Sequence, residues 1–513
     1  MPFHPLHPVS DVRAIESAAL AELPSFTLMQ RAGDAAAAAA MSLLGNEAVA
    51  AAAAERSVLV LAGPGNNGGD ALVAAANLAA LGITVEVHWH GKEDALPPDA
   101  RIALERARAA GLQPRAGANA VMVASRRWSL VIDGLFGIGL RRAIDGPLRG
   151  IVEAVNALAC PVLALDVPSG LDADTGNVVG GGAAIRATDT ISFIADKPGL
   201  HTGAGRDHAG RVHVADLQIA LGYFPEPRCG LTQPSDFASS LRPRAQQSHK
   251  GSFGDTVLVG GAAGMAGALV LASRAALLCG SGRVIAAFAG PPPAYDPLHP
   301  EVMCRDGSHI DFGAAIKGAL VLGPGLGTTP SARDLLGRAL ASEAAMLVDA
   351  DGLNLLSAHD DLTAAVVSRA TPAVLTPHPL EAARLLKTEV GRVQADRLAA
   401  ARTLASRFRC IAVLKGSGTV IADPDGEAFI NPTGNPALAT GGSGDVLSGI
   451  TGALLAQGWP PRDAALGGVW IHGRAADELA EAGTGPVGLA AGELIPAARR
   501  ILNQLIHLHA ASR

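Results

Sequence analysis

The segment SVLVLAGPGNNGGD, residues Ser57–Asp70, decides the fold of the first half of the chain. The β-branched run Ser57–Ala62 predicts a buried strand, and the glycine-rich turn Gly63–Asp70 joins it to a stretch of helical composition, Asp70–Leu81. Glycine permits positive φ angles and lets backbone N–H groups approach a phosphate, and the aspartate that ends the turn is placed beside the bound group. A second turn of this kind, GGSGD at Gly441–Asp445, indicates a second nucleotide-handling site in the other half.

Strand and helix patterns alternate through the first half of the chain. Alternation of this type predicts a parallel sheet covered by helices on both faces. Alanine runs at Ala35–Ala40 and Ala50–Ala54 are typical of helices. Further strands are expected at Ile83–Trp89, Leu130–Asp133 and Val162–Asp166, with a helix at Pro147–Leu158 and an opening helix capped by Ser10.

A proline-rich interval between Gly222 and Gln247 interrupts the pattern and marks the expected domain boundary. We predict two α/β domains, residues 1–225 and 226–513. The apolar stretch Ala263–Gly282 contains Arg274 and predicts a buried helix, not a membrane span. Strands of the second domain are expected at Asp255–Val259, Ala319–Leu322, Met346–Asp349, Ala373–Leu375 and Ile411–Leu414.

The composition narrows the class of protein. Of the 513 residues, 49% are apolar and 17% are charged, which indicates well-packed globular domains. The net charge of −6 provides no basic surface for nucleic acid or an acidic membrane. Five scattered cysteines without a CxxC pattern favour reduced thiols over disulfides or zinc. The N-terminus lacks the order of a signal peptide, so we expect a cytoplasmic protein that binds neither nucleic acid nor membrane.

Three polar turns follow predicted strands of the first domain and should meet at one edge of its sheet. They are Gly63–Asp70, Asp133–Gly139 and Asp166–Leu171. Asn67, Asp133 and Ser169 offer an amide, a carboxylate and a hydroxyl oxygen, a set of hard donors that suits a monovalent cation. Asp166 lies at a strand end, where it could act as a general acid–base or simply cap the following turn.

The second domain has its own set of turns. KGSGT, Lys415–Thr419, could bring backbone N–H groups and an ammonium to phosphates, and GGSGD places glycines at a helix start, where the dipole favours anions. Asp445 could then accept a hydroxyl proton during phosphoryl transfer, or it could only cap the helix. His378 and Glu381 follow another strand, and Glu381 could order magnesium through water.

The motifs GPGNNGGD, DGLFGIGL and DVPSGLDADTG resemble, in that order, the NAD(P)H-hydrate epimerase domain. The resemblance covers about residues 1–225 and implies a Rossmann-like three-layer αβα fold that interconverts the R and S forms of hydrated NADH or NADPH. It also implies that Asn67, Asp133 and Ser169 bind potassium (K⁺) and that Asp166 is catalytic. The residues that would contact the hydrate are Asn66, Asn67, Gly68, Gly69, Asp70, Gly137, Ile138, Gly139, Leu140, Arg141, Arg142, Ala143 and Asp166.

The second half resembles the ribokinase-like superfamily, and more closely the ADP-dependent NAD(P)H-hydrate dehydratase domain. The motifs that carry this resemblance include GPGLG, TPHPLEA, KGSGT and GGSGD. It implies ADP as co-substrate, Mg²⁺ in the site and Asp445 as the catalytic base. Hydrate contacts would come from Ala268, Gly325, His378 and Asp445, and nucleotide contacts from Lys415, Gly416, Ser417, Gly418, Thr419 and Gly444. Leu380 and Ser443 depart from the usual glycine and threonine.

The two resemblances together predict a metabolite-repair enzyme. It would epimerise the hydrates NADHX and NADPHX and dehydrate the S form with ADP, giving AMP and phosphate through a phosphorylated intermediate. A homo-oligomer is expected. Two alternatives are a small-molecule kinase, for a vitamin or sugar, fused to a nucleotide-binding module, and a chain in which one domain is a non-catalytic nucleotide sensor.

Overall fold

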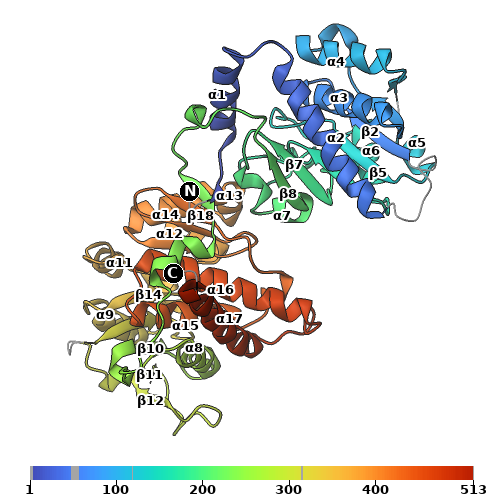
Figure 1. Cartoon of the computed structure of the whole chain (residues 1–513). Coiled ribbons are helices and arrows are strands. Elements are labelled where there is room, and N and C mark those ends of the chain that lie inside the picture. Colours follow the sequence, from blue (N-terminus) through green and yellow to red (C-terminus); the bar gives the residue numbers. More distant parts are fainter. Residues whose placement is uncertain (1–3, 48–56, 118, 313–315, 512–513) are drawn as a thin grey trace. The chain divides into compact units, whose positions relative to one another are not determined.

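The computed structural model describes residues 4–47, 57–117, 119–312 and 316–511. The chain forms two compact units (Figure 1). The N-terminal unit is Pro5–Cys229, and the C-terminal unit is Gly230–Arg513 with Met1–His4. The division therefore falls a few residues beyond Pro225. The predicted helix at Ala50–Ala54 lies outside the described residues.

The N-terminal unit is built on a parallel sheet, as the alternation predicted. Its strands follow the order β4-β3-β2-β5-β6-β7-β8, and each neighbouring pair is parallel. The strands are β2 (Ser57–Ala62), β3 (Thr84–Trp89), β4 (Arg115–Ala116), β5 (Leu130–Gly134), β6 (Val162–Leu165), β7 (Asp189–Phe193) and β8 (Arg211–Ala215). The carboxyl ends of β2, β5 and β6 are adjacent, so the three polar turns open on one edge.

Helices cover both faces of this sheet and make three layers. Because side chains alternate along a strand, Val58 and Val60 of β2 pack into one core while Leu59 and Leu61 pack into the other. The first core is closed by α1 (Val9–Leu20), α2 (Thr27–Glu47), α3 (Asn66–Ala80) and α4 (Pro98–Ala109). The second is closed by α5 (Ala120–Ala124) and α6 (Pro147–Asn156).

The predicted cap at Ser10 is wrong. Helix α1 begins at Val9 with Pro8 in the cap position, and Ser10 lies inside the first turn. The N–H of Val9 is instead satisfied by the Asp174 carboxylate at 2.7 Å, an acceptor far away in sequence. A tertiary contact thus replaces the local cap.

The C-terminal unit has a larger mixed sheet with the order β1-β9-β18-β17-β16-β15-β14-β13-β10-β11-β12. In this order, every neighbouring pair from β16 through to β12 is parallel. Strand β17 runs antiparallel to both of its neighbours, β16 and β18. The bounds are β1 (His4–Pro5), β9 (Cys229–Leu231), β10 (Asp255–Gly260), β11 (Arg283–Phe288), β12 (Val302–Asp306), β13 (Gly318–Leu322), β14 (Ala345–Val348), β15 (Val374–Leu375), β16 (Ile411–Leu414), β17 (Val420–Ala422) and β18 (Ala428–Ile430).

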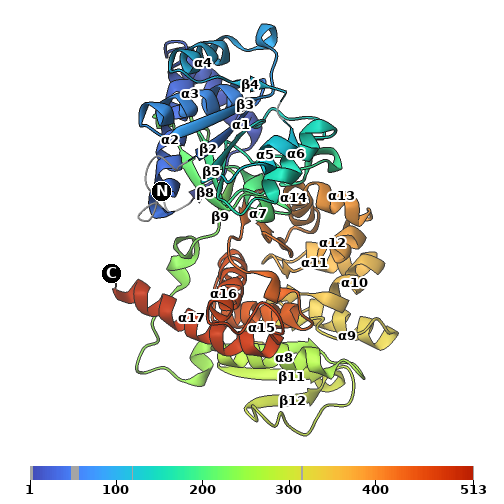
Figure 2. The same cartoon turned by 90° about the vertical axis from the view of Figure 1, so that its right-hand side faces the viewer.

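Helices also cover both faces of the second sheet (Figure 2). One face carries α8 (Ala266–Leu278), α15 (Ser443–Ala456), α16 (Pro461–Glu481) and α17 (Ala491–Ala511), which share one apolar core with the strands. The other carries α9 (Pro330–Leu340), α10 (Ala350–Ala358), α11 (Asp360–Val367), α12 (Pro379–Leu386) and α14 (Arg397–Phe408). The predicted buried helix at Ala263–Gly282 is α8. Among the described helices, none has the length and hydropathy to cross a membrane.

Helix α15, which carries Asp445 in its first turn, is packed unusually close to its neighbours. A Cβ added to Gly449 would lie 2.1 Å from the carbonyl oxygen of Ala272 on α8. A Cβ added to Gly452 would lie 2.3 Å from a methyl of Val321 on β13. Only glycine permits these approaches, so the helix is held tightly against both the sheet and α8.

Candidate active sites

The three polar turns of the N-terminal unit border a cavity of about 780 Å³. Its wall includes Pro64–Asn67, the whole segment Leu135–Asp145 and Asp166. Helix α1 contributes the opposite wall, including Arg13 and Glu16. Most of the predicted hydrate-contacting residues therefore face one space: Asn66, Asn67, Asp70, Asp166 and all of Gly137–Ala143.

Gly68 and Gly69 do not belong to the cavity wall. They lie in the first turn of α3, where a Cβ on Gly68 would be 2.0 Å from the carbonyl oxygen of Gly63. A Cβ on Gly69 would be 2.6 Å from the Met29 side chain. Both glycines are therefore needed for close packing behind the turn, and their contact with the hydrate stays a prediction.

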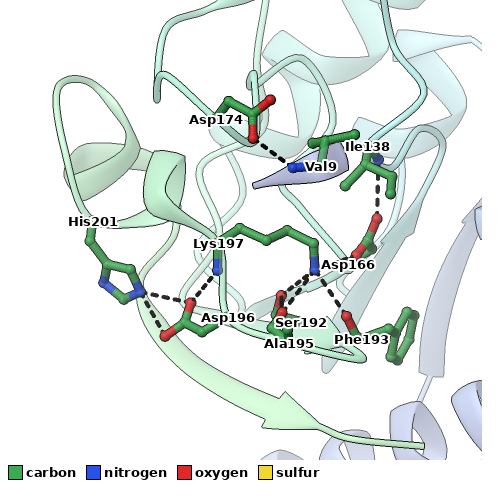
Figure 3. A network of polar contacts seen from close by, with 10 residues as sticks. All are labelled: Val9, Ile138, Asp166, Asp174, Ser192, Phe193, Ala195, Asp196, Lys197 and His201. Carbon is green, nitrogen blue, oxygen red and sulfur yellow. Dashed lines mark hydrogen bonds and ion pairs between the residues drawn. The ribbon is translucent and has the colours of Figure 1, made fainter. Parts of the chain in front are cut away.

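Asp166 is held in place by its backbone and by both carboxylate oxygens (Figure 3). It has a φ of 66°, in the left-handed region that non-glycine residues rarely adopt. Its Oδ2 accepts a hydrogen bond from the Ile138 N–H at 3.0 Å, and its Oδ1 lies 2.9 Å from the Lys197 ammonium. Backbone strain of this type at a cavity edge is common at functional sites.

The predicted cation ligands Asp133 and Ser169 are directly bonded. The fully buried Asp133 carboxylate accepts from the Ser169 hydroxyl at 2.7 Å, the Ser169 N–H at 2.8 Å and the Leu135 N–H at 3.2 Å. Burial nevertheless raises the pKa of Asp133 to about 6. Asn67 is also buried, and neither its amide oxygen nor its amide nitrogen has a hydrogen-bond partner among the described residues. A buried amide without hydrogen-bond partners is costly, so a cation that contacted the Asn67 oxygen would stabilise the site.

The second candidate site lies at the carboxyl edge of the larger sheet. Strands β13, β14, β15 and β16 are adjacent there, and the predicted turns follow β13, β15 and β16 directly. Gly325 has a φ of 59°, and a Cβ on it would lie 3.2 Å from the Cβ of Ala268. The structure thus brings these two predicted hydrate contacts together.

Lys415 lies among acidic side chains, and its positive charge opposes the rise in the pKa of Asp445. Its ammonium is 2.7 Å from Asp349 Oδ1, and the other oxygen of Asp349 accepts from the Ser448 hydroxyl at 2.7 Å. Burial alone would lower the pKa of Lys415, but Asp349 and Glu381 hold that pKa above its usual range. The ammonium also lies 3.4 Å from the position of a Cβ on Gly444.

Asp445 lies in the first turn of α15, near this ammonium. Burial, and next the charge of Asp349, raise the pKa of Asp445 to about 6, although Lys415 opposes the shift. Below the same turn the Ser443 hydroxyl lies 3.3 Å from Nε2 of the buried His472, whose pKa burial lowers to about 4. Asp445 is therefore a carboxylate that can both hold and release a proton near neutral pH.

His378 forms the N-cap of α12. Its Nδ1 accepts from the N–H groups of Leu380 at 3.1 Å and Glu381 at 3.3 Å, and the Glu381 carboxylate accepts from the His378 N–H at 2.8 Å. Burial and Lys415 lower the pKa of His378, so the imidazole is neutral and half-exposed. Glu381 is buried in this capping box, and Leu380 fits the helix start without strain.

The loop Lys415–Thr419 is fixed from behind by Arg397. This guanidinium, only 3% exposed, donates to the carbonyl oxygens of Leu414 and Lys415, both at 3.2 Å. Gly416 has a φ of 138°, and a Cβ there would be 2.9 Å from the guanidinium. The positively charged support keeps the backbone of the loop in one conformation.

Two family models match this chain, one in each unit. The model described as YjeF-related protein N-terminus matches residues 25–199, and the model described as NAD(P)H-hydrate dehydratase matches residues 256–497. The bifunctional NAD(P)H-hydrate repair enzyme Nnr of Escherichia coli (strain K12) is 39% identical over 494 residues, which covers 95% of this chain and 92% of that protein. The chain belongs to the bifunctional NAD(P)H-hydrate repair enzymes.

Other members of the repair enzyme family match over a similar length. The Nnr protein of Coxiella burnetii is 35% identical over 502 residues, covering 96% of this chain and 98% of that protein. A solved ADP/ATP-dependent NAD(P)H-hydrate dehydratase from Bacillus subtilis, co-crystallized with ATP/Mg²⁺, is 29% identical with a TM-score of 0.47 and covers 54% of this chain and 98% of that chain.

Membership of the repair enzyme family confirms the predicted fold class, a Rossmann-like domain followed by a ribokinase-like domain. It also confirms the predicted activities, an epimerase and a dehydratase of NAD(P)H hydrates on one chain. The alternative of a vitamin or sugar kinase is not favoured.

Some residues at these sites were not predicted from the sequence. In the N-terminal unit they are Lys197, which pairs with Asp166, and Glu16 on the cavity wall. In the C-terminal unit they are Asp349, Ser448 and Arg397. Asp349 directly follows β14 just as Asp166 directly follows β6, and that signal was present in the sequence.

Proposed function

We propose that the N-terminal unit interconverts the R and S epimers of NADH and NADPH hydrates, and that the C-terminal unit dehydrates the S epimer with ADP. The observation that carries this proposal is the match of one epimerase-type and one dehydratase-type family model to separate units, each with its own polar site. The dehydratase would consume one epimer, so an epimerase on the same chain makes the whole hydrate pool repairable.

In the N-terminal unit, Asp166 is proposed as a catalytic base against the C6 hydroxyl of the hydrate. Its carboxylate faces the cavity and is oriented by Ile138 and Lys197. The segment Gly137–Ala143, with Arg141 and Arg142, would contact the hydrate from the adjacent loop.

The orphaned Asn67 amide, with Asp133 and Ser169, suits a hydrated monovalent cation such as K⁺. When bound there, K⁺ would supply positive charge that fixes the first turn of α3 against the cavity. The buried Asp133 carboxylate, whose pKa is raised, would be stabilised as an anion by this charge.

In the C-terminal unit the proposed chemistry is phosphoryl transfer followed by elimination. Hydroxide is a poor leaving group, so the C6 hydroxyl is first phosphorylated by the β-phosphate of ADP, which releases AMP. Asp445 accepts the hydroxyl proton, while Lys415 and the N–H groups of the glycine turns stabilise phosphate charge. The ring nitrogen lone pair then expels phosphate to form an N1=C6 iminium ion, and loss of a proton from C5 restores the dihydropyridine.

The nucleotide would lie over the loop Lys415–Thr419 and Gly444. The described residues contain no group of three acids, histidines or cysteines that could hold a metal by themselves. Mg²⁺ would therefore be held mainly by the nucleotide phosphates and water, as is common for this ion, and would neutralise phosphate charge. The cytoplasmic location and the homo-oligomeric state stay predictions.

The test is one assay with separated R and S hydrates, enzyme, and ADP or ATP, followed at the absorbance band of reduced nicotinamide. Wild-type enzyme should consume both epimers, and Asp166→Asn should still consume S hydrate while R hydrate falls to its spontaneous rate. Release of a stable phosphorylated hydrate, seen by phosphorus NMR, would instead indicate a kinase. Unchanged turnover of R hydrate by the variant would reject the assignment of Asp166.

A further inference from the structure

Three of the carboxylates that line the cavity of the N-terminal unit come from different elements and influence one another. Asp166 follows β6, Asp70 lies in α3 just beyond its first turn, and Glu16 lies on α1. They are close enough for the charge of Asp166 to act on both of the others. Three anions cannot be held together in a partly closed cavity without compensation, so the protons must be divided among them.

Lys197 decides where the negative charge resides. Its side chain is completely buried, and its ammonium donates to the Ser192 hydroxyl at 2.6 Å and to the carbonyl oxygens of Phe193 at 3.0 Å and Ala195 at 3.1 Å (Figure 3). Among the described residues, the carboxylate that pairs with it is that of Asp166, at 2.9 Å. A buried ammonium needs an anion, and the Asp166 carboxylate supplies it.

Asp70 is in the opposite situation. It is 9% exposed, it lines the cavity, and among the described residues none forms a hydrogen bond or an ion pair with its carboxylate. Burial, and then the charges of Asp166 and Glu16, raise the pKa of Asp70 well above its usual range. The other charged residues that line the cavity are Arg13, Glu16, Asp99, Arg141, Arg142, Asp145 and Asp166. The buried Lys197 is not part of the cavity wall and pairs with Asp166.

We propose that Asp70 is a second catalytic residue of the epimerase site, the general acid that works with Asp166 as general base, and that Lys197 is the positioning residue that sets which of the two is charged. This rests on the proposed epimerase function. It assigns Asp70 a chemical role beyond contact with the hydrate.

The pair matches the chemistry of the hydrate, which carries its hydroxyl on the carbon bonded to the ring nitrogen. Asp166 takes the hydroxyl proton, the C6–N1 bond breaks as the C6 carbonyl forms, and N1 takes a proton from Asp70. Rotation about the C5–C6 bond presents the other face of the aldehyde. N1 then attacks C6, its proton returns to Asp70, and the new C6 oxygen anion takes the proton back from Asp166. No water, oxidant or metal-bound group is consumed.

The decisive experiment uses the full chain without nucleotide, so that the dehydratase is silent, and follows the epimer ratio by chromatography from one pure epimer. Asp70→Asn keeps the shape of the side chain and removes the transferable proton. We expect it to lower kcat about 10²- to 10³-fold with KM changed less than threefold, as for loss of a general acid. Asp34→Asn, an exposed carboxylate bonded to Gln30 and Asn77, is the matched control and should behave as wild type.

The pH profile separates a chemical role from a structural one. Wild-type kcat/KM should be bell-shaped, and Asp70→Asn should lose the alkaline limb, where the acid is deprotonated. Lys197→Met should move the acid limb to higher pH, and Lys197→Arg should restore it toward wild type. If Lys197→Met does not fold, the pH profile of Asp70→Asn still shows whether Asp70 has a chemical role.

Two outcomes would overturn the proposal. The first is an Asp70→Asn variant that epimerises with near-normal kcat and keeps both limbs of the pH profile of kcat/KM. The second is incorporation of one ¹⁸O per epimerisation in labelled water, because ring opening retains the C6 oxygen whereas loss of hydroxide does not. If wild-type enzyme itself fails to exceed the spontaneous rate, the proposed epimerase function fails instead, so the two failures are distinguishable.

Discussion

Replacing Asp445 by asparagine should inactivate the dehydratase and, at the same time, stabilise the unit that contains it. The amide cannot accept the hydroxyl proton, so S-hydrate dehydration should fall about 10²- to 10³-fold or more, a loss of about 3 to 4 kcal/mol of transition-state stabilisation. Epimerisation, which takes place in the other unit, should not change.

The stability change follows from the raised pKa of Asp445. Its folded-state pKa is about 6 against an ordinary value of 3.8, so the folded protein binds the proton more tightly than the unfolded chain. The corresponding stabilisation is complete below pH 3.8 and is lost as the pH rises through 6. About two pKa units correspond to about 3 kcal/mol. Asp445→Asn escapes this loss and should be more stable than wild type by up to about 3 kcal/mol at pH 8, with no gain at pH 4.

The assay is amide hydrogen exchange of peptides from the C-terminal unit, at pH 8 and near pH 4, beside dehydration rates on the same preparations. Ser448→Ala, which removes a hydrogen bond to Asp349 and leaves Asp445 in place, is a useful comparison because it should destabilise the unit at both pH values. If Asp445→Asn is inactive but no more stable than wild type at pH 8, the pKa of Asp445 is not raised in the folded protein. A variant that dehydrates normally would refute the role of Asp445 as base.

Three further outcomes are expected. Lys415→Met should reduce dehydration at least 10²-fold, measured with saturating ADP, because phosphate charge loses its cation; a change in KM for ADP alone would argue against this role. Gly137→Ala would place a methyl 2.6 Å from the Asp166 carboxylate and should slow epimerisation at least tenfold without affecting dehydration. Exchange of K⁺ for choline should lower the epimerisation rate reversibly, and Asp133→Asn should abolish the response to K⁺; a wild-type rate independent of the cation would reject the potassium site.

Much of both sites could be predicted because the carboxyl ends of parallel strands meet at one edge. Once SVLVLA and VLAL were recognised as strands, the positions of Asn67, Asp133 and Asp166 followed from topology alone. The spacing of glycine and aspartate in the turns then indicated where the backbone can approach a ligand closely and where a carboxylate lies beside it. The same logic applies to Asp349, which directly follows β14.

Other features depend on contacts that no local pattern encodes. Lys197 is a charged residue that is completely buried because Asp166 and three acceptors from the end of β7 and the turn after it converge on its ammonium. The cap of α1 comes from Asp174 and not from Ser10. Strands β17 and β18 have three residues each, which is too short for an alternation of apolar and polar residues to be recognised in the sequence. These depend on tertiary packing, which overrides local propensity.

The close packing of α15 has a consequence for how natural variation in this family is interpreted. Gly452 lies seven residues beyond Asp445, about 10 Å along the helix axis, and touches no proposed ligand. Any side chain there would push the helix off Val321 and carry Asp445 with it. An alanine at Gly449 or Gly452 would therefore be scored in an activity screen as an active-site lesion, although the altered atom lies deep in the core.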